Sequence, residues 1–101
     1  MELKELNKEK VCDVLNHIMD FELAGVVRYT HSSLMVVGRH RIPIVQFLQE
    51  QAAESLQHAQ TAGEFLTGLD GHPSQKISDI VETNDHTIKG CLLYTSDAAD
   101  E

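Results

Sequence analysis

The fold is decided by residues 11–37, VCDVLNHIMDFELAGVVRYTHSSLMVV, a stretch that contains no proline and has Gly25 as its only glycine. Six positions recur along it at steps of three and four, the spacing of one face of an α-helix. They are Val11, Leu15, Ile18, Glu22, Val26 and Tyr29. With Asn7 as a candidate N-cap, the pattern predicts a helix over about 7–37, roughly 45 Å long. Such a length is typical of a helix bundle.

A second long helix is predicted after a short turn at 38–42. Pro43 suits the first position of a helix, and Gly68, Gly71 and Pro73 end this one, so that it covers about 43–67. Its expected buried face consists of Leu48, Ala52, Leu56, Ala59, Gly63 and Leu66. Two long helices joined by so short a link lie antiparallel. The predicted fold class is therefore all-α, an antiparallel hairpin of long helices.

The remainder of the chain predicts a crossover and a further element. Residues 71–90 begin with glycine and proline, and Ile80–Ile88 is the expected start of a third element. Two helices cannot bury both of their apolar faces against each other alone. The hairpin therefore needs further helices, either from more of the same chain or from another copy.

The composition limits the function classes. A chain of 101 residues forms one small domain at most. A net charge of −8 argues against nucleic acid and anionic membranes as partners and favours cations. The most apolar window, 23–37, is interrupted by Arg28 and His31 and is too short to span a bilayer. The charged first ten residues do not resemble a signal peptide, so we expect a cytoplasmic protein.

Glu22 is the residue most indicative of chemistry. Its helical neighbours are Ile18, Gly25, Val26 and Tyr29, so the carboxylate lies within an apolar stripe. A carboxylate in such a place is costly unless it is paired, protonated or bound to a cation. The pattern is equally compatible with metal binding and with a carboxylate at the edge of the stripe that reaches water or a basic residue.

On the second helix, Glu50, Glu54 and His58 follow each other at steps of four. Glu54 and His58 could therefore face one ion, and oxygen together with imidazole suits iron, manganese or zinc. Taken alone, this spacing favours an ordinary surface pair, with Glu50 facing water. Tyr29, one heptad after Glu22, is either a core residue or a hydrogen-bond donor to a metal-bound carboxylate. The other histidines form no recognisable ligand spacing.

These residues resemble a known family. The runs LNHIMDFELAGVVRYTHSSL (15–34) and AAESLQHAQTAGEFLTGLDGHP (52–73) are similar to helices A and B of bacterioferritins, which belong to the ferritin-like superfamily. The resemblance covers roughly residues 6–90. It implies that the hairpin is the first half of a ferritin-like four-helix bundle. It also implies a di-iron centre with Glu22 and His58 as metal ligands and Tyr29 beside the site, and we take Glu54 as the candidate for a third ligand.

Two positions depart from the bacterioferritin pattern. In the Glu-x-x-His motif the glutamate falls at position 55, which is Ser55 here, and the nearest carboxylate is Glu54. Either Glu54 turns inward as the bridging ligand, or the ferroxidase site is modified or lost. The methionine that binds haem in that family is replaced by Leu56, so haem is not predicted.

The last eleven residues, CLLYTSDAADE (91–101), differ in pattern from the rest and resemble the translation of a transposase adapter used in sequencing libraries. We therefore predict that residues 1–90 are a truncated ferritin-like domain and residues 91–101 a non-native tail. Without Asp97, Asp100 and Glu101 the net charge changes from −8 to −5, and Cys12 becomes the only native cysteine.

The resemblance predicts iron binding, oxidation and storage by a homo-oligomer, with Fe(II) and Fe(III) as partners. The full-length family is of the ferroxidase type, whereas a fragment with half a site is expected to be inactive. Two alternatives remain open. One is another di-iron enzyme, such as a rubrerythrin-like peroxide reductase, against which the absence of Cys-x-x-Cys argues. The other, favoured by Ser55, is a non-catalytic helical assembly subunit.

Overall fold

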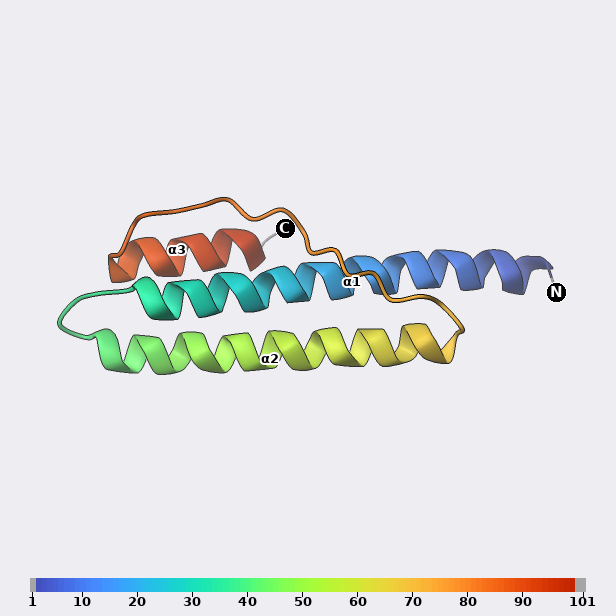
Figure 1. The fold of residues 1–101 in the computed structure, drawn as a ribbon, viewed down its shortest axis with the longest axis horizontal. Helices are drawn as coiled ribbons and strands as arrows, with labels where there is room; N and C mark the ends of the chain where they lie inside the picture. The colour runs from blue at the N-terminus through green and yellow to red at the C-terminus, as the bar shows by residue number, and fades with distance from the viewer. Residues whose placement is uncertain (1, 100–101) are drawn as a thin grey trace.

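A computed structural model describes the backbone of residues 2–99 and the side chains of residues 7–95. It contains three helices, α1 (Glu2–Met35), α2 (Arg41–Gly68) and α3 (Ile88–Ala99), and no strand within the described residues (Figure 1). None of these helices has the combination of length and apolarity that crossing a membrane requires. The predicted all-α class is confirmed.

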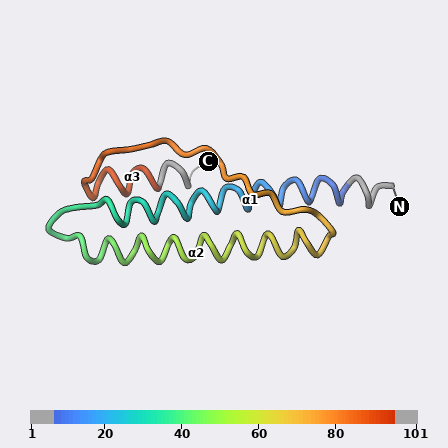
Figure 2. Tube along the Cα trace, in the orientation of Figure 1, coloured from blue at the N-terminus to red at the C-terminus, as the bar shows by residue number. Residues whose placement is uncertain are grey.

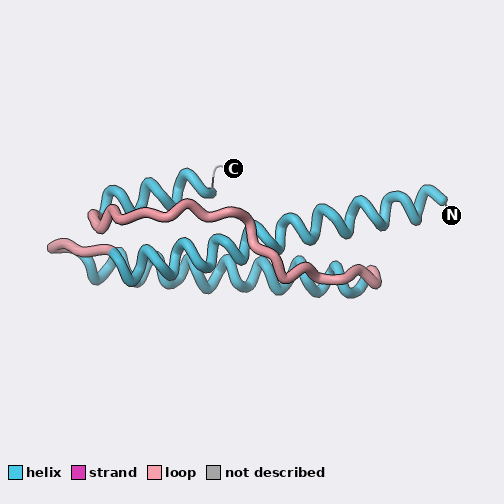
Figure 3. The backbone as a smooth tube through the Cα atoms, turned by 45° about the horizontal axis from the view of Figure 1, so that its top comes forward, coloured by secondary structure: helices cyan, strands magenta, loops and turns pink. Residues whose placement is uncertain are grey.

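The first two helices lie side by side and antiparallel, which confirms the predicted hairpin (Figure 1). The N-terminal turns of α1 extend beyond the end of α2, and the molecule measures 60 × 20 × 19 Å. Residues 71–87 run back along the hairpin without regular structure and lead to α3, which lies beside α1 (Figure 2). In the turned view of Figure 3 this crossover passes over α1.

Three expected helix starts differ from the structure. Because α1 begins at Glu2, Asn7 lies inside the helix and is not its N-cap. Because α2 begins at Arg41, Pro43 is its third residue rather than its first. Proline is still tolerated there, since the first-turn N–H groups have no acceptor within the helix. The third element begins at Ile88 rather than at Ile80.

The turn between α1 and α2 depends on Gly38, whose φ of 137° is readily adopted only by glycine. The carbonyl oxygen of Gly38 accepts a hydrogen bond from the Arg41 amide at 3.2 Å. The Arg41 side chain donates from Nε to the carbonyl oxygen of Val36 at 2.9 Å. Arg41 thus satisfies a carbonyl at the end of α1 while it starts α2.

The contact between α1 and α2 is built mainly from small residues. Ala24 and Gly25 of α1 are buried, as are Ser55, Ala59 and Ala62 of α2. A Cβ atom on Gly25 would lie only 3.2 Å from Ser55 Oγ, so the two backbones approach closely at this level. Larger buried side chains gather at the turn end, where Met35, Val36 and Leu48 form a cluster with Cys91 of α3.

Because α1 and α2 approach closely, the residues buried between them differ from those predicted. Leu56 is 41% exposed, whereas its neighbour Ser55 is buried. On α1, Val11 and Ile18 of the predicted stripe are exposed, and Met19 and Ala24 are buried instead. The expectation that Leu56 is buried was therefore wrong, because the helices make contact along their small residues. Leu15 and Tyr29 of the same stripe are partly buried and pack against the core clusters.

The crossover is tied to α1 along its length. The Asn16 side chain donates to the carbonyl oxygen of His72 at 3.1 Å and accepts from the Ser74 amide at 2.9 Å. Further along, His86 Nδ1 lies 2.8 Å from the carbonyl oxygen of Met35. These contacts bring α3 against the turn end of α1.

The predicted boundary between residues 90 and 91 falls inside α3. Cys91 is fully buried, and this burial raises the pKa of its thiol. Residues 100 and 101 of the predicted tail lie outside the described residues.

Candidate metal centre

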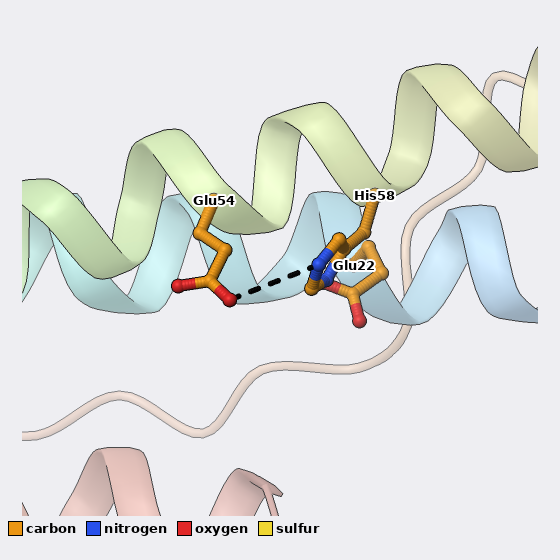
Figure 4. Close-up of polar contacts among 3 residues, drawn as sticks. All are labelled: Glu22, Glu54 and His58. Atoms are coloured by element: carbon orange, nitrogen blue, oxygen red, sulfur yellow. Dashed lines mark ion pairs between the residues drawn. The ribbon is translucent and has the colours of Figure 1, made fainter.

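Glu22 and His58 face each other across the hairpin. Glu22 lies near the middle of α1 and His58 near the middle of α2, and the antiparallel arrangement brings them to the same level (Figure 4). Glu22 Oε2 lies 3.6 Å from His58 Nδ1. Two residues separated by 36 positions in sequence therefore form one pair, as the resemblance implied.

Glu54 approaches the opposite edge of the same imidazole ring. Its Oε1 lies 3.8 Å from His58 Nε2, one helical turn away on α2 (Figure 4). The ring of His58 thus stands between two carboxylates, with one nitrogen directed at each. The structure brings together all three predicted ligands, Glu22, Glu54 and His58.

The three side chains differ in their exposure to solvent. Only 21% of the Glu22 side chain is exposed, against 57% for Glu54 and 55% for His58. Glu22 is therefore the inner carboxylate, and Glu54 and His58 are open to water. Because burial strengthens the attraction between a carboxylate and a cation, Glu22 is the strongest single candidate for a ligand.

The geometry limits how many of these groups one ion could bind. A single ion cannot use both nitrogens of one imidazole ring, so in this arrangement it could bind His58 with Glu22 or His58 with Glu54. Consistent with this limit, no three His, Cys, Asp or Glu side chains in the described part of the chain converge on one point. The donor chemistry fits iron, but these residues supply part of a single-ion site rather than a complete di-iron centre.

The site opens into a pocket of about 200 Å³. It is lined by Phe21, Glu22, Arg28, Tyr29, Gln51, Glu54, Ser55, His58 and Thr95. Tyr29 is half-buried and also packs against the cluster at the turn end. It therefore lies beside the candidate ligands, although no hydrogen bond to a carboxylate is formed by its hydroxyl within the described residues.

Arg28, Ser55 and Thr95 are the pocket residues whose burial was not predicted. Arg28 is only 7% exposed, and its guanidinium carbon lies 5.6 Å from the centre of the Phe21 ring. The signal for Arg28 was present in the sequence, because it interrupts the most apolar window of the chain. The other histidines lie apart from this pocket.

A two-helix hairpin that presents carboxylates and an imidazole toward an open side has the features of half of a metal-binding four-helix bundle. In agreement with this class, a family model described as a ferritin-like domain matches residues 12–97. The chain belongs to the ferritin-like family, whose members generally bind iron and assemble into oligomers. No curated protein and no solved structure matches the chain.

Proposed function

We propose that the chain binds Fe(II) as a subunit of a bacterioferritin-type iron-storage protein in the cytoplasm. The observation that carries this proposal is the pairing of Glu22 and His58 across α1 and α2, with Glu54 at the other edge of the ring. Carboxylate oxygen and imidazole nitrogen together are a donor set suited to iron. The family supports the same assignment, because ferritin-like proteins generally bind iron.

In this proposal iron is the cargo that the protein takes up and stores. Glu22 and one nitrogen of His58 would hold the ion. Glu54 would bind the ion at the more exposed edge of the His58 ring while the ion enters the site. When peroxide is the oxidant, two Fe(II) ions lose one electron each, and H2O2 takes up two protons to become two water molecules. Tyr29 would orient the inner carboxylate from beside the site.

Further ligands are needed before a complete di-iron centre can form. The ferritin-like arrangement uses one Glu from each of two helices and a Glu-x-x-His from each of the other two. The described residues supply Glu22, Glu54 and His58. We therefore propose that the 101-residue chain binds iron but does not turn over as a ferroxidase alone.

The test is an anaerobic Fe(II) titration of the wild type and of Glu22→Gln. The amide keeps the shape of the side chain but removes its charge, so the affinity should fall at least about ten-fold, equivalent to about 1.4 kcal/mol. Glu50→Gln is the matched control, because Glu50 is an exposed carboxylate on α2 outside the pocket. Equal affinities for the wild type and Glu22→Gln would contradict the proposal.

A second candidate function is a ferritin-like subunit that binds no iron and contributes only to assembly. Arg28 favours it, since a buried guanidinium repels a cation in the same pocket. Ser55 favours it as well, because it provides no carboxylate. Failure of the wild type to bind Fe(II) would support this candidate.

A further inference from the structure

Gly25 allows α1 and α2 to approach closely beside the candidate metal centre. It is buried, and a Cβ atom added to it would lie 3.2 Å from Ser55 Oγ and 3.6 Å from Ser55 Cβ. The first distance is tighter than an ordinary contact, whereas the second is ordinary. A residue larger than glycine would therefore meet the Ser55 hydroxyl. Because Ser55 is only 8% exposed, most of the space around this hydroxyl is already filled by protein atoms.

The contact between Gly25 and Ser55 lies next to the pair formed by Glu22 and His58. Gly25 follows Glu22 by three residues on α1, and Ser55 precedes His58 by three residues on α2. Because the helices are antiparallel, the two contacts lie about 4.5 Å apart along the helix axes. This is less than one helical turn, so the separation of the helices at Gly25 and Ser55 is transmitted to Glu22 and His58.

The distance between the two candidate ligand atoms depends on this separation. Glu22 Oε2 and His58 Nδ1 lie 3.6 Å apart. An ion such as Zn(II) binds oxygen and nitrogen at about 2.0–2.2 Å, so one ion can bridge donor atoms that are at most roughly 4.3 Å apart. The pair is within this range, but only a small widening is tolerated. Only 21% of the Glu22 side chain is exposed, which limits its freedom to follow a displaced His58.

We propose that Gly25 is a positioning residue for the metal site, because it lets the helices come close enough for one divalent ion to bind Glu22 and His58 together. Gly25 contributes no ligand atom itself. Ser55 is its counterpart on α2, a small side chain that fills the space opposite Gly25. The inference rests on the proposed iron binding and adds the residue that sets the distance between the ligands.

The test is a titration of the complete chain with Co(II), whose visible absorption reports the binding of ligands. Gly25→Ala should weaken Co(II) binding about ten-fold, the lower end of the range for changes that disturb the orientation of metal ligands. Alanine favours a helix more than glycine does, so the melting temperature of the metal-free variant should stay close to that of the wild type. A purely structural role for Gly25 would not lower the affinity without lowering the stability.

A second variant tests whether the effect arises at Ser55. Combining Gly25→Ala with Ser55→Ala removes the hydroxyl and leaves the ordinary 3.6 Å contact, so Co(II) binding should return to within about two-fold of the wild type. Gly63→Ala is the matched control, because a Cβ there would meet only Met19 Sδ at 3.4 Å, and it should leave Co(II) binding unchanged. Val36→Ala removes fully buried atoms near the turn, so it should lower the melting temperature and not the affinity.

The failures of the two proposals are distinguishable. If Gly25→Ala binds Co(II) as tightly as the wild type, the inference is overturned and the metal site stands. If the double variant binds as weakly as Gly25→Ala, the effect does not arise at Ser55 and the inference is overturned as well. If Val36→Ala loses as much affinity as Gly25→Ala, loss of stability explains both and Gly25 has only a structural role. If the wild type binds no Co(II), the proposed metal binding fails together with the inference.

Discussion

Asp85 shows how one exposed carboxylate organises the start of α3. Its Oδ1 accepts hydrogen bonds from the Thr87 amide at 3.0 Å and from the Thr87 hydroxyl at 2.7 Å. The Thr87 hydroxyl in turn accepts from the Gly90 amide at 3.0 Å, as an N-cap residue does. Asp85 therefore orients the capping side chain of α3.

These hydrogen bonds predict a pH dependence. The hydrogen bonds from the Thr87 side chain and backbone hold the pKa of Asp85 below its ordinary value. A carboxyl group whose pKa is lower when folded stabilises the fold above its unfolded pKa, and this stabilisation is lost as pH falls through the folded pKa. Asp85→Asn should therefore lower the melting temperature at about pH 7 and have little effect at about pH 2. An equal effect at both pH values would contradict the prediction.

Among the metal-site residues, the sequence predicted Glu22, Glu54 and His58, and these lie together. The spacing of Glu54 and His58 alone favoured an ordinary surface pair. The resemblance to bacterioferritins favoured a metal site. The burial of Ser55 could not be predicted from spacing. Residues 55 and 56 are about 100° apart on a helix, and which of them faces α1 depends on how closely the helices approach. That approach is set by Gly25 opposite Ser55.

At the scale of the elements, the end of α2 carries a local strain. Asp70 has a φ of 63°, in the left-handed region, and the amides of Asp70 and Gly71 donate to the carbonyl oxygens of Thr67 and Leu66. This is a Schellman termination, in which glycine is usual at the left-handed position. The sequence predicted termination by glycine near this point, but Asp70 takes the left-handed position and Gly71 follows it.

We predict that Asp70→Gly stabilises the chain by about 0.5–1 kcal/mol, because glycine adopts this conformation without the steric cost of a Cβ atom. The Lys8–Asp70 pair would be lost, but at 3.7 Å with the Asp70 side chain 90% exposed it contributes little. Thermal unfolding should show a higher melting temperature. Gly71→Ala should show the opposite, because a Cβ there would clash with Leu66 and Cys12.

The bounds of the long helices could be predicted to within a few residues, whereas the crossover could not. Residues 80–88 were expected to begin a third element, but residues 80–87 have no regular structure and α3 begins only at Ile88. Their hydrogen bonds go to other parts of the fold: the carbonyl oxygen of His86 accepts from the Val37 amide, and that of Val81 accepts from the Tyr94 hydroxyl. Such long-range partners leave no periodic pattern in the sequence.

At the scale of the whole molecule, the hairpin leaves an apolar groove uncovered. Near the end of α2 a pocket of about 410 Å³ is lined by Val11, Leu15, Glu64, Phe65, Gly68 and Leu69. Phe65 is 65% exposed, and Val11 is exposed as well. Exposed apolar surface of this kind favours association with another helix or another copy.

We predict that the chain associates as its concentration rises, as measured by sedimentation equilibrium. Phe65→Lys combined with Val11→Lys should weaken the association at least ten-fold, about 1.4 kcal/mol. Leu34→Lys is the control, because Leu34 is exposed on α1 away from this pocket. A chain that stays monomeric at every concentration, or an equal effect of Leu34→Lys, would contradict this prediction.

A further proposal concerns the organisation of the whole chain. Residues 1–90 would be the first half of a four-helix bundle, and residues 91–101 would be a non-native tail. Adapter-trimmed sequencing of the gene past the codon for Gly90 tests it. We expect the reading frame to continue into two further helices that carry a Glu and a Glu-x-x-His. A frame that continues with CLLYTSDAADE would contradict the assignment of the tail.

The most direct test of the metal site is an NMR titration of the histidine-labelled chain with substoichiometric Fe(II) without oxygen. The six histidines report on six places in the molecule at once, and paramagnetic iron broadens the imidazole signals nearest to it. We predict that His58 broadens first, because it stands between Glu22 and Glu54. If His58 stays sharp while another histidine broadens, or if no signal changes, iron does not bind between these helices.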